Sequence, residues 1–569
     1  MDQFLGVVPS TGFSAGQQPV TSSDIIDCVV LDDAGLGFRD NSDRWPAELT
    51  STDSQPAHVL FKFAGSLNRG PLLNHLLDAH DRQLTAYLAV GDLRKGYAPI
   101  GQPHSWQRLA EEVVSAVDCN ESLRRCRRVI VSLGVAGALL IEQGNQPLLV
   151  FDPMHLEGDW ERTRPGATSG LGTCIMAAMA LAVAQDPSSP DWPEALSRGL
   201  LAARTVHEQG YDYLEESEQI RFPITQAIER LVDPGDADQS LSRTAITLGK
   251  NWLVAIDDPQ KLTAVARTIV REGLFTANLG IPVERMGSWV SVDRTEIESI
   301  RSVRLIVQQY LSQPRRQKPL NLAVFGPPGS GKSFAVKQLA KEWAASSQWF
   351  DILEFNVSQF TSTLDLGLAL QRVRDAAVEQ TMPLVFWDEF DTPLEDRELG
   401  WLARFLAPMQ DGVFMDGGQG RPIGPAIFVF AGGTHPTLTS FKERAVSVPG
   451  AKATDFLSRL RGHIDVLGPN QYKETDVTFV LRRALLLRAL LSVHAPQLTY
   501  NGNPSIDPGV LHALLEVPEY LHGARSMEAI IEMSGLAGSL KFERSALPAP
   551  HQLALHVDAE AFLSSILHE

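Results

Sequence analysis

Short apolar runs alternate with amphipathic segments along the first 225 residues of the chain. The runs with the character of buried strands are 25–31, 58–63, 84–90, 129–133 and 148–151. Segments with helical spacing lie between and after them, most clearly at 106–117 and 172–184. Strands separated by helices are typical of a parallel α/β sheet. The pattern therefore predicts an α/β domain over residues 1–225.

The pattern changes after residue 225. Residues 226–294 are mainly charged with helical spacing, and we expect a helical connector there. A helix is predicted to begin at Thr295, whose hydroxyl and Glu298 fit a capping box. The apolar run at 320–325 then opens a second α/β domain, expected over 295–469. Helical patterns predict a helical domain over 470–545, followed by a tail over 546–569.

Composition places the chain among globular proteins. Of its 569 residues, 44% are hydrophobic and 21% are charged, which excludes a disordered or fibrous chain. No apolar run approaches the roughly 20 residues of a membrane-spanning helix, and the start lacks the basic and apolar stretches of a signal peptide. The four cysteines form no CxxC pair, which favours a reduced, cytoplasmic protein without structural zinc.

The charge balance is acidic. Lys and Arg number 50 and Asp and Glu 68, so the formal net charge is −18. Binding to nucleic acid or to anionic lipid over a broad surface needs clustered basic residues. Neither partner is therefore indicated. The net charge is still compatible with a local basic channel in an assembled ring.

The strongest chemical signal follows the apolar run at 320–325. There the chain has the pattern GxxxxGKS, with a predicted strand before it and a predicted helix after it. Glycines allow backbone N–H groups to turn toward phosphate oxygens, and the helix N-terminus adds a positive dipole. Lys332 is expected to reach the β- and γ-phosphates, and Ser333 to hold Mg²⁺. The predicted ATP-binding residues are Gly326, Pro327, Pro328, Gly329, Ser330, Gly331, Lys332 and Ser333.

A second motif ends another apolar strand. The run PLVFW at 383–387 delivers two adjacent acids, Asp388 and Glu389. Asp388 is expected to join the Mg²⁺ shell, and Glu389 to polarise the water that attacks the γ-phosphate. Asp391, two residues further on, is expected to serve as a helix cap or turn residue.

Residues 401–461 resemble the nucleotide-binding core of AAA+ ATPases, and the pattern is nearest to the Clp unfoldase branch. The stretch FLAPMQDGVFMDGGQGR at 405–421 is similar to a segment that leads into a β-hairpin in that branch. The resemblance puts Thr434 at the sensor-1 position, where an Asn is commoner. A hydroxyl there is able to position the attacking water or to touch the γ-phosphate.

The same resemblance assigns two arginine roles. FLSRLRGHID at 456–465 is similar to the segment that carries the arginine finger, with Arg459 as the match and Arg461 as the alternative. HGARS at 522–526 matches the sensor-2 motif, so Arg525 would contact the nucleotide of its own subunit. Because an arginine finger acts on nucleotide bound by a neighbour, the resemblance implies a homo-oligomeric ring, expected as a hexamer.

The chain departs from the Clp branch in one respect. That branch carries an aromatic-Gly pore loop that grips a threaded polypeptide, whereas residues 356–367 are short and contain no Tyr-Val-Gly. Phe360 is the one aromatic residue there that offers a substitute, and a core role is the alternative. The departure argues against processive unfolding and leaves ATP hydrolysis untouched.

The N-terminal domain is similar to the PfkB/ribokinase family of sugar and nucleoside kinases. VIVSLGVAGALLI at 129–141 resembles a strand–turn–strand of that family, and PGATSGLGT at 165–173 lies where the family has GAGD. The Asp of that motif deprotonates the accepting hydroxyl in the family. This chain has Thr173 there, so the resemblance implies a ribokinase-like domain that has lost its base.

Three roles stay open for this domain: a kinase that recruits Asp152 or Asp159, a ligand pocket without chemistry, or a structural platform. Asp32, Asp33 and Asp92 end predicted strands, where α/β pockets form. For these three acids, a ligand role and a role as solvated turn carboxylates are both consistent with the sequence.

Three hypotheses for the whole chain follow. The first is an AAA+ ATPase that couples ATP binding and hydrolysis at subunit interfaces to conformational change or assembly. Its N-terminal domain would sense an unknown protein or small molecule. The second is a sugar or nucleoside kinase regulated by the AAA+ half, against which Thr173 argues. The third is a non-catalytic, nucleotide-dependent scaffold, and chains of this architecture suggest stress or anti-phage responses by analogy only.

Overall fold

The computed structural model of the protein describes most of the chain. The described residues are 26–32, 39–50, 55–63, 70–96, 98–163, 170–210, 212–214, 219–221, 224–233, 240–247, 259–274, 280–344, 350–379, 381–448 and 450–567. They belong to two compact units, the first from Met1–Ala255 with Gly280–Pro282 and the second from Ile256–Leu279 with Val283–Glu569. Asp33 and residues 165–169, which carry part of the sequence predictions, lie outside the described residues.

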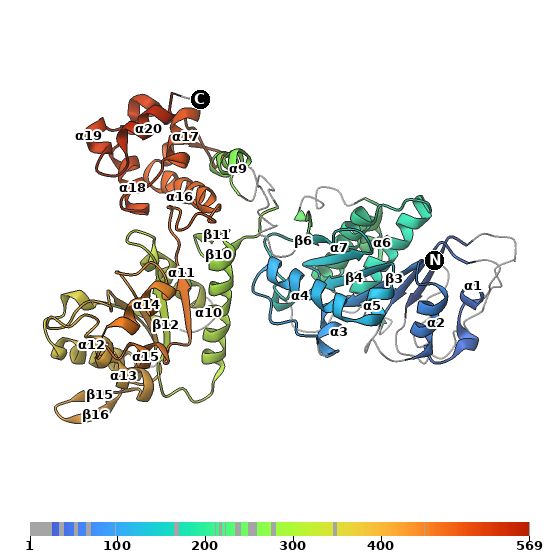
Figure 1. Cartoon of the computed structure of the whole chain (residues 1–569), viewed down its shortest axis with the longest axis horizontal. Helices are drawn as coiled ribbons and strands as arrows, with labels where there is room; N and C mark the ends of the chain where they lie inside the picture. Colours follow the sequence, from blue (N-terminus) through green and yellow to red (C-terminus); the bar gives the residue numbers. More distant parts are fainter. Residues whose placement is uncertain are drawn as a thin grey trace. The chain divides into compact units, whose positions relative to one another are not determined.

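The first unit is built on a seven-stranded sheet of order β1-β2-β3-β4-β5-β6-β9 (Figure 1). Its strands are β1 (Cys28–Asp32), β2 (His58–Lys62), β3 (Leu84–Ala89), β4 (Arg128–Leu133), β5 (Gly137–Glu142), β6 (Leu148–Phe151) and β9 (Ser242–Ala245). Strands β1 to β4 are parallel, as predicted. Each of the pairs β4–β5, β5–β6 and β6–β9 is antiparallel. For β4 and β5 the reason is the direct turn at Gly134 (φ 63°), because a tight hairpin joins only antiparallel strands.

Helices cover both faces of this sheet. Val59 and Phe61 of β2 pack with α2 (Pro71–Ala79) and α4 (Trp106–Cys119) in one apolar cluster. Leu60, between them, packs with α6 (Leu171–Gln185) and α7 (Trp192–Gln209) on the other face. Since successive strand side chains point to opposite faces, a continuous apolar strand is buried on both sides.

The second unit contains a five-stranded, wholly parallel sheet of order β13-β14-β17-β12-β18. Its strands are β12 (Leu320–Phe325), β13 (Phe350–Asn356), β14 (Met382–Asp388), β17 (Ile427–Ala431) and β18 (Gly462–Asp465). Helices α10 (Arg294–Ser312) and α11 (Lys332–Ala344) pack on one face. On the other face lie α12 (Thr363–Val378), α13 (Leu402–Asp411), α14 (Leu438–Ser447) and α15 (Ala453–Leu457). The α/β fold class predicted from the sequence is confirmed.

Helix α10 begins one residue earlier than predicted. Its N-cap is Asp293, whose Oδ1 accepts from the backbone N–H of Thr295 at 2.8 Å and of Glu296 at 3.3 Å. The cap is thus two residues before the predicted Thr295, and an aspartate satisfies the first N–H groups of the helix in the same way as a threonine. The hairpin expected before the sensor-1 position is present as β15 (Val413–Asp416) and β16 (Gln419–Pro422).

A helical subdomain completes the second unit. It contains α16 (Phe479–His494), α17 (Pro508–Glu516), α18 (Ala524–Met533), α19 (Pro550–Leu553) and α20 (Ala559–Ser565). Helix α9 (Pro259–Glu272) also belongs to it: Arg488 of α16 donates to the carbonyl of Val270 at 2.6 Å, and Arg267 contacts His512 of α17 at 3.1 Å.

Residues 226–294, expected as one connector, are thus divided. Helix α8 (Ile224–Val232) packs on α7, and β9 joins the first sheet, whereas α9 and the hairpin of β10 (Glu284–Met286) and β11 (Trp289–Ser291) lie in the second unit. The expected tail at 546–569 includes α19 and α20, and Phe562 of α20 is fully buried.

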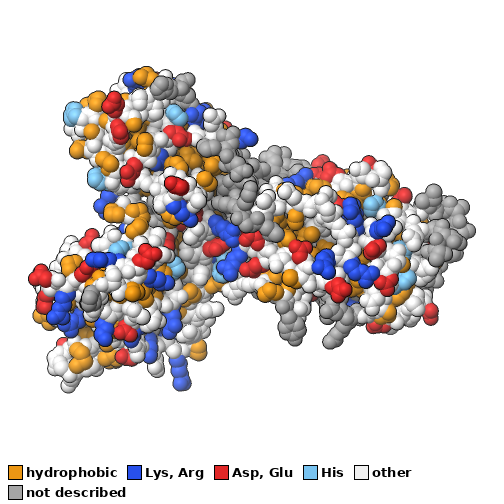
Figure 2. Space-filling model, viewed as in Figure 1, with side chains coloured by type: hydrophobic (Ala, Val, Ile, Leu, Met, Phe, Trp, Pro, Cys, Tyr) orange, Lys and Arg blue, Asp and Glu red, His pale blue; other side chains and the backbone are white. Residues whose placement is uncertain are grey.

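The remaining described elements are short. They are η1 (Ser42–Arg44), α1 (Ala47–Thr50), α3 (Val90–Lys95), α5 (Glu121–Arg125), η2 (Glu161–Thr163), β7 (Asp212–Leu214), β8 (Gln219–Arg221), η5 (Val357–Gln359), η6 (Pro496–Leu498), β19 (Thr499–Tyr500), β20 (Asn503–Pro504) and η7 (Arg544–Ala546). Within the described residues, every helix is too short or too polar to cross a membrane. Figure 2 shows acidic and basic side chains interspersed over the visible face of both units.

Candidate nucleotide-binding site

The predicted phosphate loop lies between β12 and α11. Strand β12 is buried along its whole length and ends at Phe325, and α11 begins at Lys332. Gly329 and Gly331 have φ values of 74° and 92°, which residues with side chains rarely adopt. A Cβ on Gly329 would also lie 2.2 Å from the carbonyl oxygen of His522. The loop therefore needs glycine both for its own turn and for its contact with the helical subdomain.

The ammonium group of Lys332 lies inside this loop. Its Nζ donates to the carbonyl of Gly326 at 2.8 Å and of Pro327 at 3.2 Å. Burial lowers the pKa of Lys332, and the charges of Asp388 and Asp391 oppose that shift. The hydroxyl of Ser330 is buried and has no hydrogen-bond partner among the described residues. The loop thus holds a half-buried cation and a buried, unsatisfied hydroxyl, which are able to bind phosphate oxygens.

The two acids of the second motif lie at the carboxyl end of β14. Asp388 ends β14 opposite Ala431 of β17, and the backbone N–H of Glu389 donates to Asp388 Oδ1 at 3.1 Å. Burial raises the pKa of Asp388, and the Glu389 charge raises it further. Glu389 itself has a positive φ of 52°, a strained conformation for a non-glycine residue that is common at functional sites.

Mg²⁺ fits this donor set. Asp388 is a half-buried carboxylate whose charge is insufficiently compensated, and Ser333 lies half-buried in the first turn of α11. Hydroxyl and carboxylate oxygens are the ligands that Mg²⁺ prefers. Both predicted ligands are therefore of the right chemistry: Ser333 directly follows the phosphate loop, and Asp388 is near enough for its charge to act on the pKa of Lys332.

Asp391 has a role that the sequence did not show. It lies in the turn after β14, as expected, but its buried carboxylate reaches the loop after β17. Oδ1 accepts from the N–H of Gly433 at 3.0 Å, and Oδ2 accepts from the N–H of Thr434 at 3.1 Å and from the Thr434 hydroxyl. A Cβ on Gly433 would lie 3.4 Å from Cγ of Glu389. The predicted sensor-1 residue and the predicted catalytic acid are therefore brought side by side.

The predicted sensor-2 residue, Arg525, is the second residue of helix α18. The backbone N–H of Ala524 donates to the carbonyl of Gly329 at 2.9 Å. Arg525 is exposed, and its charge adds to the effect of burial in lowering the pKa of Lys332. The first turn of α18 thus contacts the phosphate loop and places a second cation near Lys332.

A buried polar network links the sheet domain to the helical subdomain. Glu296 of α10 accepts from the N–H of Leu467 at 2.7 Å and from the hydroxyl of Ser291. Arg482 of α16 pairs with Asp476 at 2.6 Å and donates to the carbonyl of Gly468 at 2.7 Å. A Cβ on Gly468 would lie 3.2 Å from Cβ of Ser330. The connection at 467–470 therefore touches the phosphate loop on one side and the network on the other.

The two candidate fingers lie at the other end of β12. Asn321, the second residue of β12, donates to the carbonyl of Arg459 at 3.4 Å and accepts from the N–H of Arg461 at 2.9 Å. The Arg459 guanidinium contacts Gln410 and the carbonyl of Asp455, whereas Arg461 is exposed. Four residues of β12, 322–325, lie between Asn321 and the phosphate loop at Gly326, at about 3.3 Å per residue.

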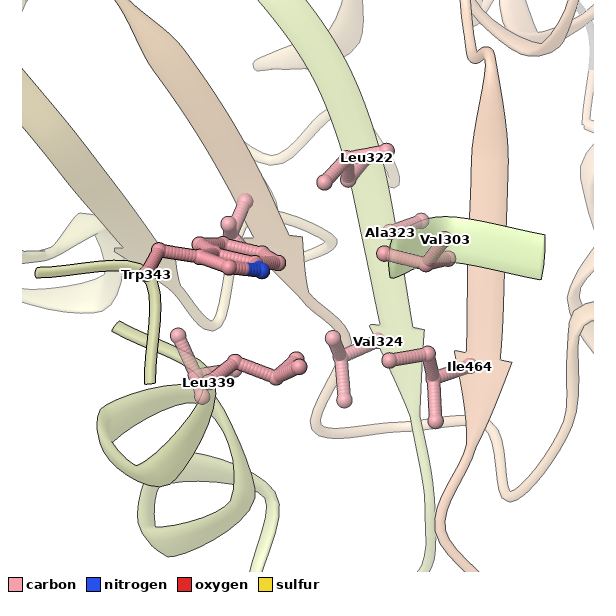
Figure 3. A pocket seen from close by; sticks show the side chains of 9 residues that line it. Val303, Leu322, Ala323, Val324, Leu339, Trp343 and Ile464 are labelled. Carbon is pink, nitrogen blue, oxygen red and sulfur yellow. The ribbon is translucent and has the colours of Figure 1, made fainter. Parts of the chain in front are cut away.

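A small cavity lies behind β12, in the core (Figure 3). Its lining is apolar and consists of Val303, Leu322, Ala323, Val324, Val336, Leu339, Trp343, Val429 and Ile464. It offers almost no polar surface to recognise a nucleotide, so it belongs to the packing between the sheet, α10 and α11.

In the first unit, Thr173 lies in the first turn of α6. Its hydroxyl donates to Asp32 Oδ2 at 3.4 Å, and the same carboxylate pairs with Lys62 at 2.7 Å. Asp152 is buried among Arg204, His155 and Trp160. Asp159 accepts a hydrogen bond from the N–H of Leu156 at 2.8 Å. Asp92 pairs with Lys95 at 3.3 Å. Asp152 and Asp159 hold local structure, whereas Asp32 and Thr173 meet at the edge of the sheet.

Comparison with known proteins identifies part of the second unit. Residues 322–424 match the family model for the ATPase family associated with various cellular activities (AAA). The matched segment contains Lys332, Ser333, Asp388 and Glu389. The match supports an AAA ATPase domain at residues 322–424, and with it nucleotide binding and ATP hydrolysis.

Two solved structures of the Aeropyrum pernix ORC2 protein are similar to the chain. The structure of its ADPNP–ADP complexes shares 14% identity over 48% of this chain and 66% of that chain, with a TM-score of 0.31. The ADP form shares 12% identity over 48% and 67%, with a TM-score of 0.25. The first match thus spans just under two thirds of the ORC2 chain. No curated protein matches the sequence.

Proposed function

We propose that this protein is a cytoplasmic AAA+ ATPase that couples ATP binding and hydrolysis at subunit interfaces to conformational change or assembly. One observation carries the interface part of the proposal. Asn321 fixes Arg459 and Arg461 at the amino end of β12, while Lys332 follows its carboxyl end. An arginine at one end of the strand reaches a phosphate group only when a second copy of the chain presents its loop.

Each residue of the proposed site has a separate role. Lys332 neutralises phosphate charge, and Ser333 and Asp388 would hold Mg²⁺, which supplies charge compensation at the phosphates when it is bound. Glu389 accepts a proton from the attacking water. Arg459 stabilises charge on the phosphoryl group held by the neighbour, and Arg525 reports the state of its own nucleotide to the helical subdomain. Contact between Ala524 and Gly329 supports that last role.

Assembly is testable, because an arginine finger acts only between subunits. Particle mass is measured with and without a non-hydrolysable ATP analogue, together with ATPase turnover per subunit over a range of protein concentration. We expect a ring, a hexamer of the 62.3-kDa chain, and turnover that rises with concentration. A monomer that hydrolyses ATP at a constant rate per subunit would refute the interface mechanism.

The first unit is proposed as a ribokinase-like domain that senses a ligand or a protein partner. A second candidate function, a sugar or nucleoside kinase, has one observation in its favour: Asp32 brings a carboxylate to the hydroxyl of Thr173 at the start of α6. The pairing of that carboxylate with Lys62 counts against its use as a base.

Incubation with a panel of sugars and nucleosides and labelled ATP separates the two functions. A sensing domain gives no phosphorylated product, and Thr173→Ala leaves ATPase turnover within about threefold. Product that survives Lys332→Ala and is lost in Asp32→Asn would establish the kinase.

A further inference from the structure

The loop after β17 has its hydrogen-bond donors already engaged. Gly432 donates its N–H to the carbonyl of Val324 at 3.1 Å. The N–H groups of Gly433 and Thr434 donate to Asp391 at 3.0 and 3.1 Å, and so does the Thr434 hydroxyl. Three successive N–H groups and the one hydroxyl proton of this loop therefore point away from a ligand.

The acceptor of these bonds is well suited to hold them. Asp391 is only 3% exposed, and within the described residues its carboxylate takes part in no ion pair within 4.0 Å. Hydrogen bonds to a buried carboxylate are stronger than bonds between neutral groups. A buried carboxylate without hydrogen-bond donors would be costly. The charge of Asp391 therefore keeps the three donors of Gly433 and Thr434 in their present direction.

The direction of one proton decides what Thr434 is able to bind. A hydroxyl has one donor and two acceptor sites. With its proton on Asp391, Thr434 Oγ1 only accepts, and a phosphate oxygen also only accepts. A water molecule, by contrast, has two protons to donate. Thr434 is exposed, and Gly433, the residue before it, lies beside Glu389: a Cβ on Gly433 would lie 3.4 Å from Cγ of Glu389.

From this arrangement we infer that Asp391 is a positioning residue that fixes Thr434 as an acceptor for the attacking water and prevents it from binding the γ-phosphate. The inference rests on the proposed ATPase function and deepens it. The water oxygen forms a bond to the γ-phosphorus, the bond to the β-phosphate oxygen breaks, and ADP leaves with that electron pair. One water proton passes to Glu389, and the other stays on the new phosphate hydroxyl, directed at Thr434.

The test compares Thr434→Val, which keeps the shape but removes the hydroxyl, with Thr434→Ser, which restores it. We expect Thr434→Val to lose about 10-fold to 100-fold in kcat, and Thr434→Ser to stay within about threefold of the wild type. The affinity for a non-hydrolysable ATP analogue relative to ADP should not change in either variant. A loss of 10-fold or more in that ratio in Thr434→Val would show a phosphate contact and overturn the inference.

Asp391→Asn tests the positioning residue itself. Its amide cannot accept all three donors, so the hydroxyl of Thr434 is released. We expect a kcat loss equal to that of Thr434→Val, and no further loss in the double variant, because both changes remove one interaction. Additive losses would contradict the coupling. If Asp391→Asn does not fold, the inference is still falsifiable, because a loss of the analogue-to-ADP affinity ratio in Thr434→Val at the exposed Thr434 overturns it.

Failure of this inference differs from failure of the proposed function. A wild-type protein without ATPase turnover, or with turnover that survives Glu389→Gln, contradicts the proposed function. Turnover that is lost in Glu389→Gln but kept in Thr434→Val contradicts only the role of Asp391 and Thr434.

Discussion

The backbone N–H of Ala524 donates to the carbonyl of Gly329 across 2.9 Å. This bond joins the first turn of α18 to the phosphate loop, so the helical subdomain is in direct contact with the segment that would hold the phosphates. A change at the loop is transmitted to α18 without an intermediate side chain.

Replacing Gly329 with Ala should therefore damage more than the loop. The new Cβ would lie 2.2 Å from the His522 carbonyl, in addition to the strain of a φ of 74°. We expect a lower melting temperature and faster amide hydrogen exchange in α18. Gly331→Ala is the matched control, because its φ of 92° gives similar strain, about 1–3 kcal/mol, while its Cβ would meet no atom within 4 Å. Equal exchange in α18 of both variants would contradict the coupling.

Lys332 and Glu389 should separate binding from hydrolysis. Lys332 neutralises phosphate charge in the ground state, whereas Glu389 acts only on the water. Lys332→Ala should abolish nucleotide binding, while Glu389→Gln should bind ATP normally and lose turnover. Equilibrium binding of a fluorescent ATP analogue and phosphate release measure the two steps. Equal loss of binding in both variants would refute this division.

Arg459 should act on the neighbour's nucleotide. Arg459→Ala should bind ATP and lose on the order of 10³ in turnover, as for other arginine fingers. Mixing it with Glu389→Gln should restore activity, because one type of interface in the mixed ring combines an intact Glu389 with an intact Arg459. Arg461→Ala is the control at the same end of β12. If co-assembled mixtures stay inactive, Arg461 becomes the candidate.

Glu296 should make stability depend on pH. Burial, with the nearby charge of Asp293, raises the pKa of Glu296 to about 7, and Arg482 opposes the shift. The unfolded chain loses this proton near pH 4.5 and the folded chain near pH 7, so stability falls as pH rises between these values. The loss is about 3 kcal/mol above pH 7.

The neutral isostere Glu296→Gln tests this directly. Urea midpoints at a series of pH values from 5 to 8.5 should be similar for both proteins at the acidic end. At the alkaline end the variant should be the more stable, because it carries no buried charge to ionise. A constant difference between the two proteins over the whole range would show that Glu296 does not titrate there.

The sequence predicted the features that depend on neighbouring residues. The phosphate loop, with its strand before and helix after, is encoded by a continuous stretch from 320 to 344. The parallel strands β1 to β4 could be predicted from their apolar runs, because a short continuous apolar run is typical of a strand that is buried on both faces. Strand β9 at the antiparallel edge of that sheet was missed, since it lies about ninety residues after β6 and only Ala245 of its four residues is apolar.

The roles of Asp391 and Glu296 could not be predicted in this way. Asp391 contacts a loop 42–43 residues away, and Glu296 accepts from Leu467, 171 residues away. Such contacts are set by the order of strands in the sheet, which no local pattern contains. Asp391 itself is visible in the sequence, two residues after Glu389. Its contact with the loop after β17 could be predicted only from the pairing of β14 with β17 in the sheet.

Helix α9 has a practical consequence for dividing the protein. The chain leaves the first unit near residue 255, contributes α9 to the second, returns at Gly280–Pro282 and leaves again. Leu262, Ala266, Ile269 and Val270 of α9 are all buried. A cut after residue 282 therefore cannot yield an intact second unit, because α9 stays with the first fragment. A fragment starting at residue 283 would expose the apolar surface of α16 and aggregate, and adding residues 256–279 as a separate peptide should restore its solubility.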